Sequence, residues 1–489
     1  MLAPELIERQ EIDPALSDRK RSDLGEEFAK LHRQLQDTDK SMLVIVDGWE
    51  SSGKGYLLKD LTRELDPKFY EVATFDQAQD HESCFPYLRR FFLRAPRRGQ
   101  IVFFDRSFYY DLFHNLDWQG QELAHLIEDI AFVEQALHHD NTLVVKFFID
   151  HTEAEMAKRI KELEKDPYRD VLLSDQDYDQ LDNYQAYRQH FIDILNRTNY
   201  ADTPWQVLHV TGKKDQSRLA LQICIDRLAE WLDTDLSRSP QFDFNQAVTG
   251  DLPLDQVDLT AHIDKVDYDE IKDQLQKEAG DLLYQAYRQG KGVILAYEGH
   301  DAAGKGGNIK RLTRLMDPRG YDVATTAAPN QEEADHHYLW RFYRDFPSHG
   351  RMTIFDRTWY GRVLVERVEG FTPDYRVQEA YSEINQMEHN LVHQGYLVLK
   401  YLILIDKDEQ YDRFKDREEN PDKQYKITDE DWRNREKFAA YQGAMNDMVR
   451  YTSSPEAPWT LVPGNNKRYA RIFVLKDFIK RMQAFLATD

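Results

Sequence analysis

A glycine-rich stretch near the middle of the chain has the spacing of a phosphate-binding loop. In YEGHDAAGKGG, from Tyr297 to Gly307, Gly299 is followed after four residues by Gly304 and Lys305. In such a loop the backbone N–H groups and the N-terminus of the following helix bind phosphate, and the lysine bridges phosphate oxygens. The usual pattern continues with a Ser or Thr that binds Mg²⁺, but this chain has Gly306 there. The sequence therefore predicts phosphoryl chemistry with a different metal ligand.

Two aspartates are the candidates for that ligand. Asp301 lies inside the glycine loop, and Asp356 ends an apolar segment that we expect to be a strand. Mg²⁺ prefers oxygen ligands and usually keeps several waters, so two converging carboxylates would replace the missing hydroxyl. Arg357 follows Asp356 directly and would clamp phosphate oxygens. The alternative for Asp301 is a turn residue that bonds to its own backbone.

Basic residues gather near the loop although the whole chain is acidic. The chain has 64 Lys and Arg against 87 Asp and Glu, a net charge of −23, which argues against broad nucleic-acid or membrane binding. From Gly304 to Arg367, however, basic residues outnumber acidic ones. Guanidinium groups clamp phosphates in pairs, so this excess suits a ligand with many phosphates; the alternative is a solvated helix face. The predicted phosphate- or nucleotide-binding residues are Gly299, Ala303, Gly304, Gly306, Gly307, Lys310, Arg341, Arg362, Arg413 and Lys426, and the basic set also includes Arg311, Arg314, Arg319, Arg344 and Arg367.

A charged segment further along, from Asp408 to Trp432, is the candidate for a lid. It is interrupted by Pro421, and its basic residues include Arg413, Arg417, Lys423 and Lys426. Kinases with a phosphate-binding loop cover the phosphates with such a segment and exclude water. The alternative is a helical hairpin on the surface.

The chain contains this region twice. MLVIVDGWESSGKGYLLKDLTRELDPKFYEVA aligns without gaps on VILAYEGHDAAGKGGNIKRLTRLMDPRGYDVA, so that Lys54 matches Lys305 at an offset of 251. Further along the offset is 254, and Trp205 matches Trp459. A repeat of about 230 residues indicates a tandem duplication. We predict domains over 1–235 and 261–489, joined by a linker over 236–260 that mixes Pro, Gly and polar residues.

Each copy predicts an α/β domain. A short apolar strand precedes the glycine loop and a helix, a second strand ends in Asp-Arg, and a third is followed by a Thr or Asp that would cap a helix. Apolar strands alternating with helices predict a parallel sheet covered on both faces, with ligands at the carboxyl ends of the strands. The expected strands are 42–46, 101–104 and 143–149, then 293–297, 352–355 and 397–405.

The first copy differs from the second where phosphate would bind. The first copy keeps Lys54, Asp105 and Arg106. Charge reversals at other positions would repel a polyanion. We therefore predict that the second copy is catalytic and that the first is a degenerate partner. The replacements are Glu50 for Asp301, Tyr56 for Gly307, Leu57 for Asn308, Asp60 for Arg311, Asp111 for Arg362, Leu116 for Arg367 and Leu172 for Lys426.

Location and assembly can also be predicted from the sequence. Two cysteines, Cys84 and Cys224, suit a reducing compartment. The N-terminus lacks an apolar signal core, and no run approaches the ~18 apolar residues of a membrane helix. We expect a cytoplasmic protein that binds neither nucleic acid nor membrane. Because a tandem chain can mimic a dimer of single units, we also expect a homo-oligomer, with a dimer favoured.

Four motifs together closely resemble the polyphosphate kinase 2 family: EGHDAAGKGGNIKRLT, DPRGYDVA, HHYLWRFYRDFP and FDRTWYGRVLVERVEGF. The resemblance covers Asp269 to about Met482 and extends more faintly to the first copy, so the chain is similar to the tandem two-domain form. It implies tandem P-loop kinase-like domains, each a parallel sheet flanked by helices with a helical lid. It also implies Mg²⁺ and transfer of the terminal phosphoryl group of inorganic polyphosphate to AMP, giving ADP.

The same resemblance implies roles for particular residues. Asp301, Lys305, Asp356 and Arg357 match the catalytic motifs, with Asp301 and Asp356 as metal ligands. Lys426 falls where the family carries a basic lid residue, although KQYKITDEDW departs from the commoner KWKLSP wording.

Three other functions stay open. A polyphosphate kinase with ADP or GDP as acceptor would use the same residues. A nucleoside monophosphate kinase that uses ATP would normally carry Ser or Thr after the loop lysine, where this chain has Gly306. A phosphate-sensing scaffold would bind polyphosphate without turnover, and the intact catalytic set of the second copy argues against it.

Overall fold

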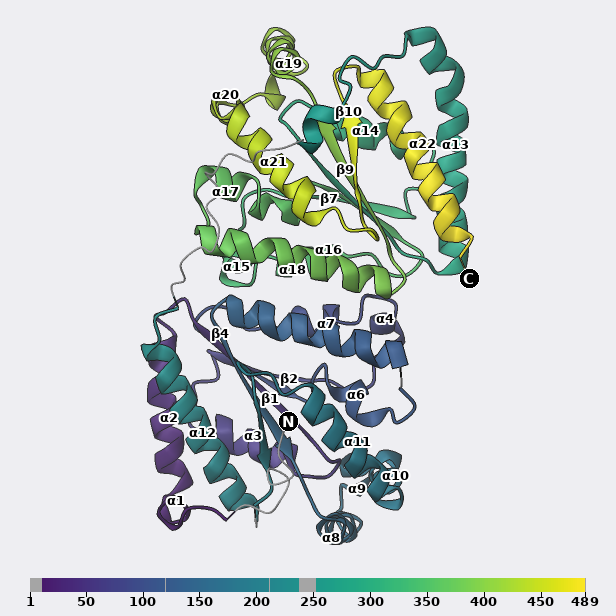
Figure 1. Cartoon of the computed structure of the whole chain (residues 1–489). Helices are drawn as coiled ribbons and strands as arrows, with labels where there is room; N and C mark the ends of the chain where they lie inside the picture. Colours follow the sequence, from purple (N-terminus) through teal and green to yellow (C-terminus); the bar gives the residue numbers. More distant parts are fainter. Residues whose placement is uncertain (1–10, 119, 211, 237–251, 489) are drawn as a thin grey trace. The chain divides into compact units, whose positions relative to one another are not determined.

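The computed structural model describes residues 11–118, 120–210, 212–236 and 252–488, which divide into two compact units (Figure 1). The first unit lies mainly within 11–236 and the second mainly within 252–488. Of the predicted linker over 236–260, residues 237–251 lie outside the described residues. The part that follows contains a short 3-10 helix, η2 (Pro253–Gln256), whose Leu254 is buried and donates its N–H to Asn446 Oδ1 at 3.0 Å.

Five parallel strands form the sheet of the first unit, in the order β2-β3-β1-β4-β5. All eight residues of β1 and all eight of β4 are buried, as expected for central strands with both faces covered. Val46, near the end of β1, pairs with Asp105 at the end of β3, which brings the glycine loop and the Asp-Arg pair to one edge. The strands are β1 (Ser41–Gly48), β2 (Tyr70–Thr74), β3 (Ile101–Asp105), β4 (Thr142–Ile149) and β5 (Trp205–Leu208).

Helices cover both faces of this sheet. Apolar residues of α2, α3 and α12 form a core with one face, and α7 packs on β4 at the other. Thr152 caps α8 in a capping box with Glu155, as the sequence predicted. The helices over residues 11–236 are α1 (Pro14–Asp18), α2 (Arg21–Leu35), α3 (Lys54–Thr62), α4 (Asp80–Ser83), α5 (Arg89–Phe92), α6 (Tyr110–His114), α7 (Gly120–His139), α8 (Glu153–Leu163), α9 (Arg169–Leu172), α10 (Asp175–Asp182), α11 (Tyr184–Arg197) and α12 (Lys213–Asp233).

The second unit repeats this sheet in the order β7-β8-β6-β9-β10, again with parallel pairs. Tyr297 of β6 pairs with Asp356 at the end of β8, so the second glycine loop also has an Asp-Arg pair beside it. The strands are β6 (Val293–Gly299), β7 (Tyr321–Thr325), β8 (Met352–Asp356), β9 (Leu397–Leu404) and β10 (Trp459–Pro463).

The helices of this unit also lie on both sides of its sheet. Apolar residues of α13, α14 and α22 pack on one face, where Figure 1 shows α13 and α22 side by side. On the other side α18 packs on β9 and on α21. The helices over residues 252–488, besides η2, are α13 (Lys265–Gln289), α14 (Lys305–Leu312), α15 (Gln331–Asp335), α16 (Trp340–Asp345), η3 (Trp359–Arg362), α17 (Val365–Glu369), α18 (Asp374–His393), α19 (Lys407–Glu419), η4 (Gln424–Lys426), α20 (Asp429–Glu436), α21 (Phe438–Thr452) and α22 (Lys467–Leu486).

The fold class predicted from the sequence is confirmed, and the structure adds two edge strands to each sheet. The three strands predicted in each copy are the central ones. β2 and β7 lie at a sheet edge, where nearly all of their residues are exposed or half-buried, so they lack the continuous apolar run that marks a buried strand. β5 and β10, at the other edge, have only four and five residues.

A buried ion pair recurs in both units and supports their common origin. Lys146 Nζ lies 2.9 Å from Glu134 in the first unit, and Lys400 Nζ lies 2.7 Å from Glu388 in the second. All four side chains are at most 1% exposed. Each lysine also donates to a backbone carbonyl, as a buried charge requires.

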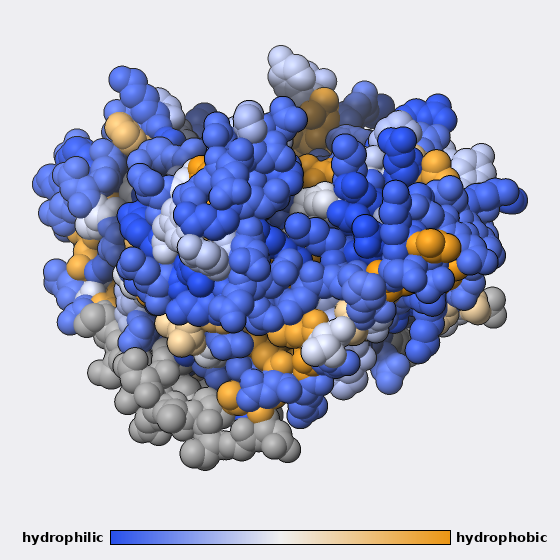
Figure 2. All heavy atoms as spheres, turned by 90° about the horizontal axis from the view of Figure 1, so that it is seen from above, coloured by the Kyte–Doolittle hydropathy of each residue, from blue (hydrophilic) through white to orange (hydrophobic). Residues whose placement is uncertain are grey.

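The surface is mainly hydrophilic, in keeping with the charged composition. Figure 2 shows one face of the molecule, on which apolar residues form only small separate groups. Within the described residues, no helix has the length and the apolar character needed to cross a membrane.

Candidate functional site

The second glycine loop joins β6 to α14. Gly299 has φ +145°, and a Cβ there would lie 2.3 Å from the carbonyl oxygen of Ile403, so only glycine fits. Gly304, with φ +106°, precedes α14 and provides no side-chain cap. The first N–H groups of α14 therefore point out of the helix without intrahelical partners, which is the arrangement that binds phosphate.

Lys305 is the first residue of α14 and folds back over the loop. Its Nζ donates to the carbonyl of Gly299 at 2.7 Å and to that of His300 at 3.5 Å. These contacts hold the ammonium group at the mouth of the loop, where it can contact a bound phosphate.

Asp301 is held by three groups around its carboxylate and backbone. Oδ1 lies 3.3 Å from Arg357 Nη2, and Oδ2 accepts a hydrogen bond from Asn434 Nδ2 at 2.9 Å. Gln410 Nε2 donates to the backbone carbonyl of Asp301 at 3.1 Å. Burial acts to raise the pKa of Asp301, but Lys305, the Asn434 hydrogen bond and Arg357 outweigh it and lower the pKa below its ordinary value. Asp301 is therefore ionised at neutral pH and suited to bind a cation.

Asp356 and Arg357 end β8 beside the loop. Arg357 has φ +65°, a left-handed conformation that is uncommon for residues other than glycine, and its N–H donates to the carbonyl of Tyr297 at 3.2 Å. Thr358, the next residue, donates from its N–H and its Oγ1 to Glu298, both at 2.8 Å. Backbone strain of this kind persists when the surroundings enforce it, and it concentrates at functional sites.

Glu298 is the buried carboxyl that fixes this turn. Burial raises its pKa, while Lys305, Thr358 and Arg357 act to lower it, and the net shift is upward. The neighbouring His300 stacks on Phe438 at 4.3 Å with an interplanar angle of 11°. Burial, aided by Lys305, lowers the pKa of His300 to about 4, so its imidazole is neutral at neutral pH.

The loop, the β8 end, the start of α22 and the segment 408–432, predicted as a lid, line an open pocket of about 850 Å³. Nine cationic side chains line it against four carboxylates. This excess, on a chain with a net charge of −23, favours a ligand that carries several negative charges. The cations are Lys305, Arg311, Arg357, Arg413, Arg417, Lys423, Lys426, Lys467 and Arg471, and the carboxylates are Asp301, Asp356, Asp416 and Asp431.

The structure brings most of the predicted site residues together. Lys426, predicted from the lid, lines the pocket with the four predicted catalytic residues and most of the predicted loop glycines. Gly299 lies under the loop as the acceptor for Lys305. The predicted residues that line the pocket are Asp301, Ala303, Gly304, Lys305, Gly306, Gly307, Asp356, Arg357, Arg413 and Lys426, together with Arg311 of the basic set and Arg417 and Lys423 of the segment predicted as a lid.

Besides Gly299, three of the ten residues predicted to bind phosphate or nucleotide do not line this pocket. Arg362 pairs with Glu366 at 2.8 Å and donates to Thr372 Oγ1 at 2.6 Å. Arg341 donates to the carbonyl of Ala327 at 3.0 Å, and Lys310 is exposed on α14. A role for these three as ligands stays a prediction.

Arg413 lines the pocket, but all its N–H groups donate hydrogen bonds to acceptors of the protein itself. Nη1 donates to the carbonyls of Ala302 and Ala303 at 2.9 and 2.7 Å, and Nη2 to those of Gly464 and Asn465 at 2.7 and 3.0 Å. Nε donates to Glu409 at 2.6 Å. Five donors with five acceptors make Arg413 a positioning residue for the glycine loop.

Sequence reasoning missed four residues of this site. Lys467 and Arg471 lie in the first turn and a half of α22, after the unpredicted edge strand β10. A basic pair spaced i, i+4 at a helix N-terminus was the available signal, since positive charge is unfavourable there for the helix itself. Asn434 and Gln410, which hold Asp301, carry no signal in the sequence alone.

In the first unit the matching cations are neutralised by one carboxylate. Glu50, at the position of Asp301, lies 2.9 Å from Arg106, 2.9 Å from His114 and 3.6 Å from Lys54. Burial acts to raise the pKa of Glu50, but Lys54, His114 and Arg106 together lower it well below its ordinary range. Glu50 thus neutralises the cations that a phosphate would contact at this loop.

The start of α3 is also filled in the first unit. Tyr56, at the position of Gly307, accepts a hydrogen bond from Arg21 Nη1 at 2.7 Å. Lys213 lies over its ring at 5.7 Å, and Arg21 also pairs with the buried Asp60. In the second unit, by contrast, a Cβ at Gly307 would meet only Arg471 Nη2, at 3.7 Å.

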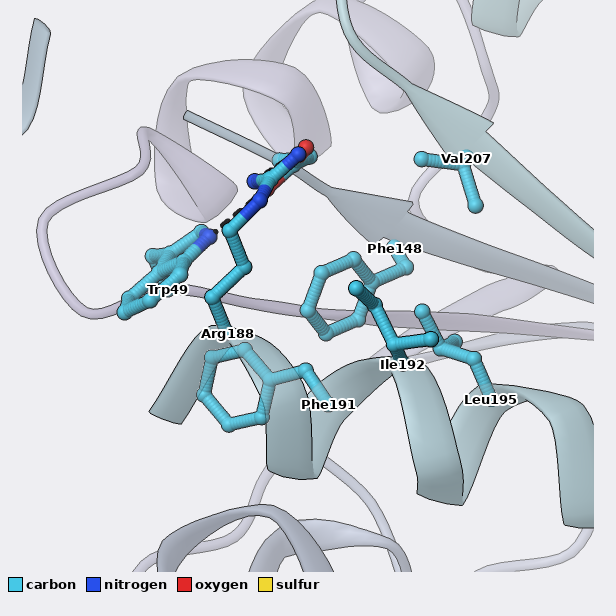
Figure 3. A pocket seen from close by; sticks show the side chains of 8 residues that line it. Trp49, Phe148, Arg188, Phe191, Ile192, Leu195 and Val207 are labelled. Carbon is cyan, nitrogen blue, oxygen red and sulfur yellow. Dashed lines mark hydrogen bonds and ion pairs between the residues drawn. The ribbon is translucent and has the colours of Figure 1, made fainter. Parts of the chain in front are cut away.

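Aromatic side chains fill the first unit beside its loop. Trp49, at the position of His300, stacks on Tyr184 at 4.7 Å and donates its Nε1–H to Asp150 at 2.8 Å. Figure 3 shows Trp49, Arg188 and Phe191 around a small cavity of about 10 Å³, close to the lower limit for one water.

Both units match one known family. The sequence profile described as Polyphosphate kinase 2 (PPK2) matches twice, over residues 11–236 and 262–488. The chain belongs to the polyphosphate kinase 2 family. Its two matches correspond to the tandem two-domain form expected from the internal repeat, and that prediction is confirmed.

Similarity to individual members of the polyphosphate kinase 2 family extends over both units. The chain is 35% identical over 468 residues to the polyphosphate:AMP phosphotransferase of Pseudomonas syringae pv. tomato, covering 94% of this chain and 93% of that protein. It is 37% identical over 459 residues to the polyphosphate:AMP phosphotransferase of Pseudomonas aeruginosa, covering 92% of each. A crystal structure described as a polyphosphate kinase 2 from Pseudomonas aeruginosa is 33% identical, with a TM-score of 0.86 over 99% of both chains.

Proposed function

We propose that this polyphosphate kinase 2 transfers the terminal phosphoryl group of inorganic polyphosphate to AMP and releases ADP. Family membership makes the chain a phosphotransferase. The observation that carries the choice of donor is the set of nine cations around one pocket on an acidic protein. AMP as acceptor is favoured because two relatives matched over both units are polyphosphate:AMP phosphotransferases.

The residues of the second unit supply positioning and charge neutralisation, which dominate phosphoryl transfer. The N-terminus of α14 and Lys305 would hold the phosphates at the loop. Arg357, whose side chain is 56% exposed, would neutralise oxygens of the transferred group. Lys467 and Arg471 from α22, with Lys426 from the lid, extend the cationic wall for the rest of the phosphate chain.

Asp301 and Asp356 fit the Mg²⁺ that the family resemblance implies. Both carboxylates line the pocket, and the lowered pKa of Asp301, in which Lys305, Asn434 and Arg357 outweigh burial, keeps it ionised. A Cβ at Gly306 would lie 3.7 Å from Asp356 Oδ2, so Asp356 stands beside the place of the usual Ser or Thr. Bound Mg²⁺ would neutralise phosphate charge and orient phosphate oxygens. This explains why the loop tolerates Gly306.

The catalytic role is proposed for the second unit alone. In the first unit Glu50 neutralises Lys54 and Arg106, and Tyr56 fills the start of α3. In the second unit the matching position is Gly307 and the pocket is open. The first unit is then a partner that keeps the fold without the phosphate site.

The experiment is an acceptor and donor matrix. The full chain with Mg²⁺ is given AMP or ADP as acceptor, and long-chain polyphosphate or ATP as donor, and nucleotide products are separated by chromatography. The proposal expects ADP from AMP with polyphosphate in the absence of ATP. Turnover of ADP to ATP without turnover of AMP would favour the second candidate, a polyphosphate kinase with ADP as acceptor. Turnover with ATP as the only effective donor would contradict the proposal.

A further inference from the structure

Two histidines and a glutamate converge near the end of α18. His389 and His393 are four residues apart, so both project from one face of the helix. Glu456, from the loop between α21 and β10, has Oε2 at 2.9 Å from His389 Nδ1. The two imidazole centroids are 3.7 Å apart, and one ligand atom from each of the three side chains lies within 4.8 Å of the others.

We propose that His389, His393 and Glu456 bind a divalent transition metal ion with zinc-like preferences. Two imidazoles and one carboxylate form the ligand set of many zinc sites, with metal–ligand distances of about 2.0–2.2 Å and water in the fourth position. Ligand atoms around a tetrahedral zinc ion lie about 3.3 Å apart, so small side-chain rotations convert the observed cluster into a ligand set. Mg²⁺ prefers oxygen ligands, so this site differs in chemistry from the Asp301–Asp356 pair.

The elements that carry these side chains are already fixed. Asn385, one turn before His389, donates from Nδ2 to the carbonyl of Tyr451 at 2.8 Å and so ties α18 to the end of α21. The loop that carries Glu456 is held by the Ala457 N–H, which donates to Ser454 Oγ at 3.0 Å. A metal ion would therefore meet a pre-organised site on a rigid scaffold.

The proposed site lies at the amino ends of the strands, and the phosphate pocket lies at their carboxyl ends. α18 leads into the amino end of β9, and the loop of Glu456 leads into the amino end of β10. The pocket lies at the carboxyl ends of the same sheet, beyond Gly299 and Asp356. Eight residues of β9 span roughly 26 Å at about 3.3 Å per residue. The metal ion would therefore link α18 to the loop before β10, a structural role separate from phosphoryl transfer.

The first unit provides an internal comparison. At the offset of 254 the matching residues are Gln135, His139 and Asp202. Gln135 stands in place of His389, so the first unit retains one imidazole where the second has two. His389→Gln therefore copies a replacement that the chain already tolerates at the equivalent helix position.

The test measures zinc binding by the full chain in excess Mg²⁺, which occupies sites made only of oxygen ligands. Equilibrium dialysis with metal analysis gives stoichiometry and affinity, and thermal unfolding with and without Zn²⁺ gives the stabilisation. We expect His389→Gln to lose one equivalent of Zn²⁺ and most of the Zn²⁺-induced rise in the thermal midpoint, with turnover in zinc-free buffer unchanged. Asp301→Asn should keep the bound equivalent of Zn²⁺ and the Zn²⁺-induced rise in the thermal midpoint.

Glu456→Gln provides a second variant, because Glu456 is 42% exposed on a loop and its substitution leaves the core intact. It should weaken Zn²⁺ binding about tenfold or more by removing the charged ligand. Co²⁺ in place of Zn²⁺ should give the intense visible absorption of a four-coordinate site in the wild type and lose it in both variants. Equal Zn²⁺ stoichiometry and an equal midpoint shift in wild type and variants would overturn the proposal and leave only the His389–Glu456 hydrogen bond.

Discussion

The carboxylate of Glu50 lies 2.9 Å from the guanidinium of Arg106, buried in the loop of the first unit. At the matching positions of the second unit, Asp301 approaches Arg357 only to 3.3 Å, and the Arg357 side chain is 56% exposed. Glutamate is longer than aspartate by one methylene group, and this extra reach lets Glu50 serve as an internal anion. The two copies of the loop therefore differ in how closely the carboxylate holds the arginine beside it.

Removing the loop lysine should affect turnover differently in the two units. Lys305→Ala should lower kcat with AMP and polyphosphate about 10²–10³-fold, the effect of deleting one pre-organised charge-stabilising group. Lys54→Ala should leave kcat within about twofold, because Lys54 is held by Glu50 and by the Trp49 carbonyl at 3.0 Å. Steady-state ADP formation measures both. Loss of turnover in Lys54→Ala with activity retained in Lys305→Ala would reverse the assignment.

Placing the tyrosine of the first unit at the matching position of the second should block the pocket. In Gly307→Tyr the new Cβ would meet only Arg471 Nη2 at an ordinary 3.7 Å, so the variant should fold while its ring fills the start of α14. We expect a loss of turnover of tenfold or more with a thermal midpoint close to that of the wild type. The reverse change in the first unit, Tyr56→Gly, serves as the control and should leave turnover unchanged. A fully active Gly307→Tyr would show that phosphate binds elsewhere.

Two cations of the pocket should respond differently to substitution. Arg413→Lys removes donors to Ala302, Ala303, Gly464 and Asn465, so it should lower both the thermal midpoint and kcat. Lys467→Ala removes an exposed charge at the N-terminus of α22, where the helix itself gains nothing from a cation. It should raise the KM for polyphosphate, more at low salt, without lowering the midpoint. Identical effects of the two changes would contradict this division of roles.

A buried carboxyl in the first unit should make stability depend on pH. Burial raises the pKa of Asp47 from 3.8 to about 6, although Ser107 Oγ donates to it at 2.6 Å. The native state therefore binds this proton more tightly than the unfolded state and loses stability as the pH rises through about 6. A difference of about two pKa units corresponds to about 3 kcal/mol.

The corresponding variant is Asp47→Asn, which keeps an acceptor for Ser107 without a charge. The thermal midpoint of the variant relative to wild type should be higher at about pH 8 than at about pH 5. The same difference at both pH values would show that Asp47 stays ionised or neutral throughout.

The parts of the site that lie close together in sequence were predictable. The glycine loop, Lys305 and Asp301 fall within one strand–turn–helix segment, and Asp356 follows a strand whose apolar run is unmistakable. The internal repeat then placed the same elements in the first unit. Parallel strands have their carboxyl ends at the same end of a sheet. The fold class alone therefore predicts that the glycine loop and Asp356 lie close together.

The rest depended on contacts between segments that the sequence does not relate. Arg413 had the composition of a phosphate ligand, but its five acceptors come from three separate segments and are visible only in the folded chain. Lys467 follows the short edge strand β10, which has no long apolar run from which it could be predicted. Arg362 was placed in the basic set by type alone, and its partner Glu366 lies four residues further along the chain, in α17.

Phosphoryl transfer by the second unit is tested by ADP formation from AMP and long-chain polyphosphate with Mg²⁺ and without ATP. The assay is run on the wild type, on Asp301→Asn and on the matched variant Glu50→Gln. We predict ADP from the wild type, nearly none from Asp301→Asn, and turnover close to wild type from Glu50→Gln. No ADP from the wild type, or loss of turnover in Glu50→Gln with activity kept in Asp301→Asn, would contradict this prediction.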